Sequence, residues 1–97
     1  FLRHVHSGMN LQEAIDAPAW HTEHFPISFW PRTARPGVIV VEGRLPQPTV
    51  EELRRRGHIV EVGPDWSEGR LVAASHDGPF LRAAANPRGM QGYAAGR

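Results

Sequence analysis

The stretch VIVVEGRLPQPTVEELRRRGHIVEVG, residues 38–63, decides the fold that we expect for this chain. Residues 38–43 are a continuous β-branched run ended by glycine, which favours a strand buried on both faces. Residues 58–63 predict a second strand, in which successive side chains point to opposite faces. Between them, Thr49 and Glu52 have the spacing of a capping box, so a helix is expected to begin at Thr49. The stretch therefore predicts a strand–helix–strand unit.

The segment before this unit predicts two short helices. The apolar spacing in residues 1–7 fits the last turns of a helix whose start is missing, and Gly8 stands where a C-terminal glycine cap would lie. Asn10 and Glu13 then form a capping-box pattern that begins the next helix. Pro18 ends that helix, because the residue before a proline avoids the helical region.

The segment after the unit predicts a β-hairpin. Two apolar runs, residues 70–75 and 79–85, flank a His-Asp-Gly sequence at 76–78, and Asp-Gly between such runs is a strong hairpin signal. The glycine-rich tail, residues 86–97, predicts extended or loose chain. The expected fold class is therefore α/β, more narrowly α+β, with one domain or fragment over residues 1–97.

Between the helices and the first strand lies a segment rich in proline and in large aromatic residues. The prolines argue against regular structure, whereas the rings argue against a flexible linker. We expect an irregular segment whose rings pack against a surface. The alternative is a stand-alone binding module in which residues 20–30 grip a partner. The rings concerned are Trp20, Phe25, Phe29 and Trp30.

Composition narrows the class of protein. Hydrophobic residues make up 40% and charged residues 22% of the chain, which is typical of a folded domain and not of a disordered one. The net charge of +1 gives no electrostatic reason to expect a nucleic acid or an anionic membrane as partner. There are no cysteines, so disulfides and thiolate chemistry are excluded. The first residues lack an initiator Met and the pattern of a signal peptide, and resemble the middle of a longer chain.

Six histidines raise the possibility of a metal site. On a helix, His4 and His6 would point about 200° apart and could not share one ion. His21 and His24 are three residues apart and lack the HExxH pattern, and no third ligand is evident. A small histidine–metal protein stays open as an alternative, but we expect no metal ligand and no cofactor.

The remaining polar residues suggest no catalytic group. Residues 54–56 are three arginines, which suit the last turn of a helix, with glutamates upstream as ion-pair partners. No carboxylate pair has spacing that favours acid–base work, and no serine or threonine lies in a nucleophile motif. We therefore expect no catalytic, cofactor-binding or metal-binding residue within residues 1–97.

The stretch GMNLQEAIDAPAWH, residues 8–21, resembles a segment near the C-terminus of the gamma-glutamyltransferase family of N-terminal-nucleophile hydrolases. The stretch at 38–58, with its Arg-Gly-His end, is similar to the strand and helix of that family. The closing Asn86-Pro87-Arg88 resembles its Asp-Pro-Arg. Ala19 stands where the family usually has arginine, residues 21–36 are unlike commoner members, and Arg97 stands where many members end in tyrosine.

This resemblance implies an αββα sandwich in the parent protein, of which this chain would be a C-terminal fragment. The implied chemistry is transfer or hydrolysis of gamma-glutamyl groups through an acyl-enzyme on an N-terminal threonine. The threonine, the Gly-Gly oxyanion region and the serine pair of the family would lie upstream, so the chain alone is expected to be inactive. The implied partners are the large subunit, the first part of the small subunit and a gamma-glutamyl substrate. A fragment with uncovered faces is also expected to self-associate.

Overall fold

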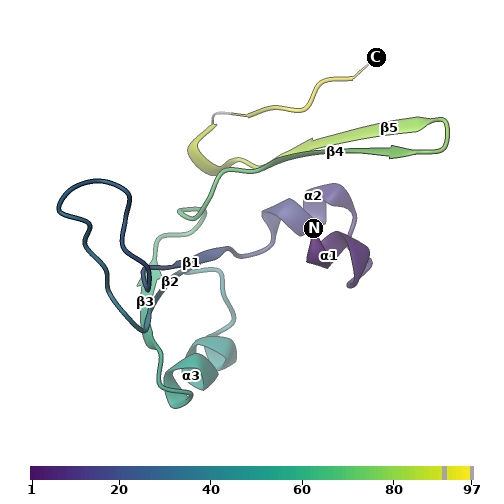
Figure 1. Cartoon of the computed structure of the whole chain (residues 1–97). Coiled ribbons are helices and arrows are strands. Elements are labelled where there is room, and N and C mark those ends of the chain that lie inside the picture. Colours follow the sequence, from purple (N-terminus) through teal and green to yellow (C-terminus); the bar gives the residue numbers. More distant parts are fainter. Residues whose placement is uncertain (91, 97) are drawn as a thin grey trace. The chain divides into compact units, whose positions relative to one another are not determined.

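The computed structural model describes residues 1–90 and 92–96. The chain divides into two compact units (Figure 1). Unit 1 combines Phe1–Ala17 with Arg70–Arg97, and unit 2 is Pro18–Gly69. Each unit mixes helices with an open sheet. The expected α+β class is therefore confirmed.

Unit 2 is a three-stranded sheet with one helix. Its strands are β1 (Trp20–Thr22), β2 (Val38–Glu42) and β3 (Ile59–Gly63), and β2 lies in the middle. Strand β2 is antiparallel to β1 and parallel to β3. Parallel neighbours require a crossover, which α3 (Gln47–Arg55) supplies. The strand–helix–strand prediction is confirmed.

An apolar cluster lies between α3 and the sheet of unit 2. Val41 and Val50 are 1% and 2% exposed, and Val60 is also buried. The half-buried side chains of Ile39, Leu45 and Leu53 pack against these three. All of β2 is buried or half-buried, as the β-branched run predicted for a central strand.

The start of α3 differs from the prediction. The helix begins at Gln47 with Pro46 as its N-cap, and Thr49 lies inside the first turn. The backbone N–H groups of Thr49 and Val50 donate to the carbonyl of Pro46 at 2.9 and 3.2 Å. Proline has a helical φ and no N–H to satisfy, so Pro48 fits the first turn and allows an earlier start.

The aromatic segment was expected to be irregular, and this was wrong for its first residues. Strand β1 pairs Trp20 with Val41 and Thr22 with Ile39. Pro18 lies before this strand and no proline lies within it, so its backbone N–H groups are free to pair with β2. The rings find no packing surface within the described residues: all four of Trp20, Phe25, Phe29 and Trp30 are exposed.

Unit 1 begins with two short helices, α1 (Leu2–Val5) and α2 (Leu11–Asp16). The capping box of α2 is confirmed, because the Glu13 N–H donates to Oδ1 of Asn10 and the Asn10 N–H donates to the Glu13 carboxylate, both at 2.9 Å. The helix ends before Pro18, as predicted. Gly8 has φ +68°, a left-handed conformation that glycine adopts without strain.

The hairpin of unit 1 consists of β4 (Val72–Asp77) and β5 (Phe80–Ala85), against which α2 packs. Its turn is Gly78-Pro79, one residue later than the predicted His-Asp-Gly, since His76 and Asp77 still pair with β5. Gly78 has φ +57°, and glycine suits a positive φ at the first position of a two-residue hairpin turn.

The tail after the hairpin is not loose at its start, contrary to the prediction. Asn86 is buried, and η1 (Arg88–Met90) is a 3₁₀ turn with Arg88 only 2% exposed. Buried hydrogen bonds, described below, order these residues. The part of the prediction that concerns Gln91 and Arg97 lies outside the described residues. Within the described residues, no helix combines the length and the apolar run needed to cross a bilayer.

Candidate functional site

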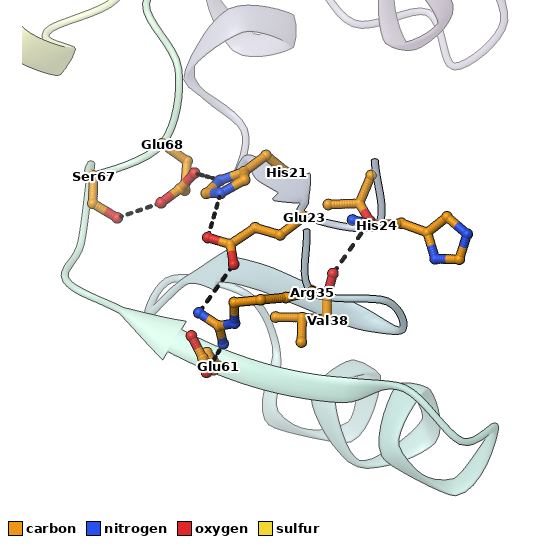
Figure 2. A network of polar contacts seen from close by, with 9 residues as sticks. His21, Glu23, His24, Arg35, Val38, Glu61, Ser67 and Glu68 are labelled. Atoms are coloured by element: carbon orange, nitrogen blue, oxygen red, sulfur yellow. Dashed lines mark hydrogen bonds and ion pairs between the residues drawn. The ribbon is translucent and has the colours of Figure 1, made fainter. Parts of the chain in front are cut away.

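A network of charged side chains lies on the sheet of unit 2 (Figure 2). His21 on β1 donates from Nδ1 to the carboxylate of Glu68, in the loop after β3. Its Nε2 lies 3.6 Å from Oε1 of Glu23. Arg35 pairs with Oε2 of Glu23 at 3.0 Å and also with the carboxylate of Glu61 on β3. The network thus joins β1, β3 and the loop that follows β3.

The neighbouring carboxylates shift the protonation of this network. The hydrogen bond to Glu68 is the main reason why the pKa of His21 is raised above 6.5, and partial desolvation opposes it. The charges of Glu68 and Glu23 add to the increase. The hydrogen bond to Glu61 likewise raises the pKa of Arg35. His21 therefore holds its proton to a higher pH than a free imidazole.

Ser67, Glu68 and His21 have the residue types of a catalytic triad, but their contacts are in the wrong order. Oγ of Ser67 lies 3.3 Å from Oε1 of Glu68, and it is the carboxylate that contacts the imidazole. A serine nucleophile must pass its proton to the imidazole. The arrangement therefore ties a loop to β1 and does not activate Ser67.

Two further histidines, His24 and His4, contact backbone groups. Nδ1 of His24 accepts from the Gly37 N–H at 3.3 Å, and Nδ1 of His4 donates to the Met9 carbonyl at 2.7 Å. Among residues 1–90 and 92–96, no three His, Cys, Asp or Glu side chains are placed to hold a metal ion. Within these described residues, the histidines at 4–6 and 21–24 are thus not brought together as ligands of one ion.

Two of the three arginines at the end of α3, Arg55 and Arg56, pair with an upstream glutamate as the sequence indicated. Nε of Arg55 and Nε of Arg56 lie 2.6 and 2.7 Å from the carboxylate of Glu52. Arg54 donates to the carbonyl of Val60 at 3.2 Å. These guanidinium groups therefore stabilise the end of α3 and its junction with β3.

Glu42 is a buried carboxylate in unit 2 that sequence analysis missed. Its side chain is fully buried at the end of β2. The Ala19 and Glu68 N–H groups donate to its two oxygens, each at 3.1 Å, and Arg44 lies 3.6 Å away. The Arg44 guanidinium in turn stacks 3.3 Å from the centre of the Trp66 ring. A carboxylate that directly continues a buried β-branched run was the signal that could have indicated this role.

Arg88 is the corresponding buried cation in unit 1. It donates to the carbonyls of Ile15, Asp16 and Ala17 at 2.6, 3.4 and 3.0 Å. These are carbonyls at the C-terminal end of α2, which lack partners within the helix. When the side-chain amide of Asn86 is oriented with its oxygen toward the neighbouring donors, Oδ1 of Asn86 accepts from the Arg88 guanidinium at 3.0 Å. Arg88 therefore caps α2 from a distant part of the chain.

A shallow groove beside the hairpin of unit 1 offers little chemistry. Its polar side chains are Ser75 and Arg82, and Arg82 pairs with Asp77 at 2.9 Å. The rest of the lining is small or apolar: Ala74, Leu81, Ala83, Ala94, Ala95 and Gly96. The groove holds no pair of groups suited to acid–base or nucleophilic catalysis.

Comparison with known proteins connects these features to a family. Residues 1–96 match the gamma-glutamyltranspeptidase family. The chain belongs to this family. The family lies within the N-terminal-nucleophile hydrolases, so the resemblance noted from residues 8–21 is confirmed. A solved structure named LmbA2991HD shares 60% sequence identity and a TM-score of 0.86 over 96% of this chain and 16% of its own.

Two curated members are similar across most of this chain. The glutathione hydrolase-like YwrD proenzyme of Bacillus subtilis is 33% identical over 84% of this chain and 15% of its own length. The oxamate amidohydrolase proenzyme of Klebsiella pneumoniae is 33% identical over 99% of this chain and 17% of its own. The chain thus spans about one sixth of the length of these relatives.

A more distant family member shares the fold. The gamma-glutamyltranspeptidase of Pseudomonas nitroreducens, solved with L-DON, has a TM-score of 0.66 at 21% identity, over 99% of this chain and 44% of that chain. The two proteins thus share the arrangement of helices and strands.

Proposed function

We propose that residues 1–97 are a structural C-terminal part of a gamma-glutamyltranspeptidase-like enzyme. The observation that carries this proposal is the family match over residues 1–96, in a chain that spans about one sixth of its curated relatives. The large subunit and the first part of the small subunit are the partners that this proposal implies. Residues 1–97 would then fold as one fragment of the parent.

The chemistry of the whole protein would be acyl transfer from an amide. A threonine at the start of the small subunit attacks the carbonyl carbon of a gamma-glutamyl amide, and its own amino group takes the hydroxyl proton. The amine leaves with a proton, which gives a threonine ester. Water or an amino acceptor then cleaves that ester. Both curated relatives are named as proenzymes, one as glutathione hydrolase-like and the other as an oxamate amidohydrolase, which supports a processed enzyme that cleaves amides.

Within this chain, the described side chains support a structural role. The set formed by Ser67, Glu68 and His21 has contacts in the wrong order for a nucleophile. The buried charges Glu42 and Arg88 are bonded to backbone groups. Helix α1, by the family resemblance, would support the oxyanion loop of the parent. The hairpin would complete a sheet. We therefore propose that residues 1–97 alone are inactive.

The decisive experiment expresses the protein from its whole native gene. Intact mass and N-terminal sequencing should give two chains, the smaller beginning with threonine and containing residues 1–97, and the preparation should hydrolyse a chromogenic gamma-glutamyl anilide. Replacement of that threonine by alanine should leave one uncut, inactive chain. Residues 1–97 expressed separately should release no anilide above the buffer rate. Activity of residues 1–97 alone would overturn the structural assignment.

A second candidate function, a stand-alone binding module, is favoured by one observation. The rings at 20–30 are exposed instead of packed, as a binding surface requires. This interpretation predicts a single 10.8 kDa chain from the native gene, whereas the enzyme interpretation predicts larger chains.

If residues 1–97 are a fragment of an enzyme, we further propose that the isolated fragment self-associates through faces that the rest of the protein would cover. A concentration-independent monomer mass by light scattering would contradict that proposal.

A further inference from the structure

A loop of unit 2, residues 24–34, has a defined backbone. We call it the aromatic loop; Figure 1 draws it in dark blue between β1 and β2. At its base, the Arg35 N–H donates to the carbonyl of Glu23 at 2.8 Å. Within it, the Ile27 N–H donates to the Thr33 carbonyl at 3.0 Å, and the Arg32 N–H donates to the Phe29 carbonyl at 2.7 Å. These bonds fix the loop before any partner is present.

The fixed loop presents its apolar side chains to solvent. Phe25, Ile27, Phe29 and Trp30 are 74%, 50%, 80% and 90% exposed. Single exposed apolar residues are ordinary, but four within six positions form a patch. Buried aromatic side chains each remove about 150–250 Å² from water, so the three rings would contribute on the order of 500 Å². One partner of a typical specific interface contributes roughly 800 Å², so this patch would supply more than half.

The aromatic loop also carries a positive charge. Arg32 lies two residues after Trp30, and no Asp or Glu occurs between residues 24 and 34. Among the ion pairs of the described residues, Arg32 takes part in none. Its φ of +59° is costly for a residue with a side chain, and such conformations concentrate at binding sites. Tryptophan and arginine are also the residue types enriched at interface hot spots.

These features restrict what can cover the loop. Two copies of the loop that met about a two-fold axis would bring like charges together without a carboxylate. A lipid surface binds amphipathic segments through several cations, whereas this loop has one arginine. The chain spans about one sixth of its curated relatives, so under the proposed function much polypeptide remains to cover the patch.

We propose that the aromatic loop docks onto another part of the same full-length polypeptide. Its rings enter an apolar hollow, and a carboxylate beside that hollow receives Arg32. This inference rests on the proposed function for the existence of that polypeptide, but it requires neither cleavage of the precursor nor activity.

The test is hydroxyl-radical footprinting of the protein expressed from its whole native gene, read by mass spectrometry. Phe29 and Trp30 should be labelled at least about tenfold more slowly in the folded monomer than in the urea-unfolded protein. The inactive variant that lacks the nucleophilic threonine should give the same protection, which separates this inference from the catalytic proposal. Labelling of both rings within twofold of the unfolded rate would overturn the docking. Protection that appears only with dimer formation, or only with added anionic vesicles, would assign the loop to a second copy or to lipid and would also overturn it.

Matched arginine variants test the proposed carboxylate. Arg32→Gln should raise the labelling of Trp30 about fivefold, because the docked loop loses its ion pair. Arg55→Gln is the control, since Arg55 is exposed on α3 in the same unit and pairs with Glu52. It should leave the labelling of Trp30 unchanged. Equal labelling in the two variants would refute the carboxylate, and Trp30→Phe, which keeps a ring, should keep Phe29 protected.

Discussion

Units 1 and 2 each contain a buried charged side chain that is bonded to the backbone, with opposite signs. In unit 2, Glu42 accepts from the N–H groups of Ala19 and Glu68. In unit 1, Arg88 donates to the carbonyls of Ile15 and Ala17, among others. Both side chains satisfy backbone groups that no regular ladder or helix pairs.

The units differ in what surrounds this charge. Unit 2 has a cluster of buried valines beside Glu42, namely Val41, Val50 and Val60. In unit 1 the largest fully buried side chain is Arg88 itself, and the buried apolar side chains are mostly small. The stabilisation from burying apolar side chains does not depend on how they are oriented, whereas a buried charge is tolerated only when a partner pairs with it. Unit 1 should therefore depend on one polar residue more than unit 2 does.

The largest effect is expected from Arg88→Met. This change keeps the side-chain bulk but leaves the Ile15 carbonyl without the Arg88 donor and the Ala17 carbonyl with only the longer bond from Arg3, at a cost of about 3 kcal/mol of unfolding free energy. Urea unfolding followed by circular dichroism measures it. Arg82→Met is the control, because Arg82 is exposed and its contacts with Asp77 and the Phe80 ring lie at the surface, and it should cost less than about 0.5 kcal/mol. Equal costs would show that the buried cation is dispensable.

The second largest effect is expected from a change in the buried valine cluster of unit 2. Val41→Ala removes two methyl groups from a fully buried position and should cost about 2 kcal/mol, since each buried carbon contributes about 0.8 kcal/mol and a cavity remains. Val62 pairs with Val41 across β2 and β3 but is half exposed, so Val62→Ala should cost well under half as much. Hydrogen exchange of the β2 amides gives both values. If Val62→Ala is the more damaging change, the buried cluster is not centred on Val41.

A smaller effect is expected from Glu42→Gln. The amide keeps one oxygen but turns an NH₂ group toward one of the two backbone donors, which should cost about 1.5 kcal/mol. Tryptophan fluorescence during urea unfolding reports unit 2, which contains all three tryptophans of the chain. Glu61→Gln, on the exposed face of β3, is the control and should change stability little. A neutral Glu42→Gln would mean that the buried carboxylate is not needed.

The smallest effect is the pH dependence of the His21–Glu68 pair. The pKa of His21 is raised in the folded protein, so its stabilisation is fully present below pH 6.5 and disappears as pH rises through the raised pKa. The pair is partly exposed, which limits this contribution to less than about 1 kcal/mol. His21→Gln should therefore destabilise more at pH 5.5 than at pH 8.5. In Glu68→Gln, the midpoint of the His21 titration measured by NMR should move back toward 6.5. An unchanged midpoint would contradict the conclusion that Glu68 raises the pKa of His21.

The elements of this protein could be predicted where the signal is local. The strand run at 38–42, the capping box of Asn10 and Glu13, and the end of α2 before Pro18 each depend on neighbouring residues, and each prediction was confirmed. The start of α3 was missed because proline at its second position competes with the capping-box pattern of Thr49. The turn of the hairpin was placed one residue early because Asp-Gly alone does not fix which residues stay paired.

The roles of the buried charges could not be predicted in the same way. Arg88 caps a helix more than seventy residues earlier, and Glu42 joins backbone groups that lie far from it in sequence. Arginine in a glycine-rich tail and glutamate at a strand end read as surface residues, because charged side chains are usually exposed. The network of His21, Glu68 and Glu23 likewise could not be predicted from the sequence, because it depends on how the strands pair.

The sequence by itself determined the α+β order of elements, the capping of α2 and, through residues 8–21, the family. These depend on backbone propensity, on contacts within a few residues and on a motif that can be read directly. Only the tertiary structure decided which charges are buried and which rings are exposed. Burial depends on segments that approach one another from distant parts of the chain, and the cost of desolvating Glu42 and Arg88 is offset only by backbone partners that the folded units provide.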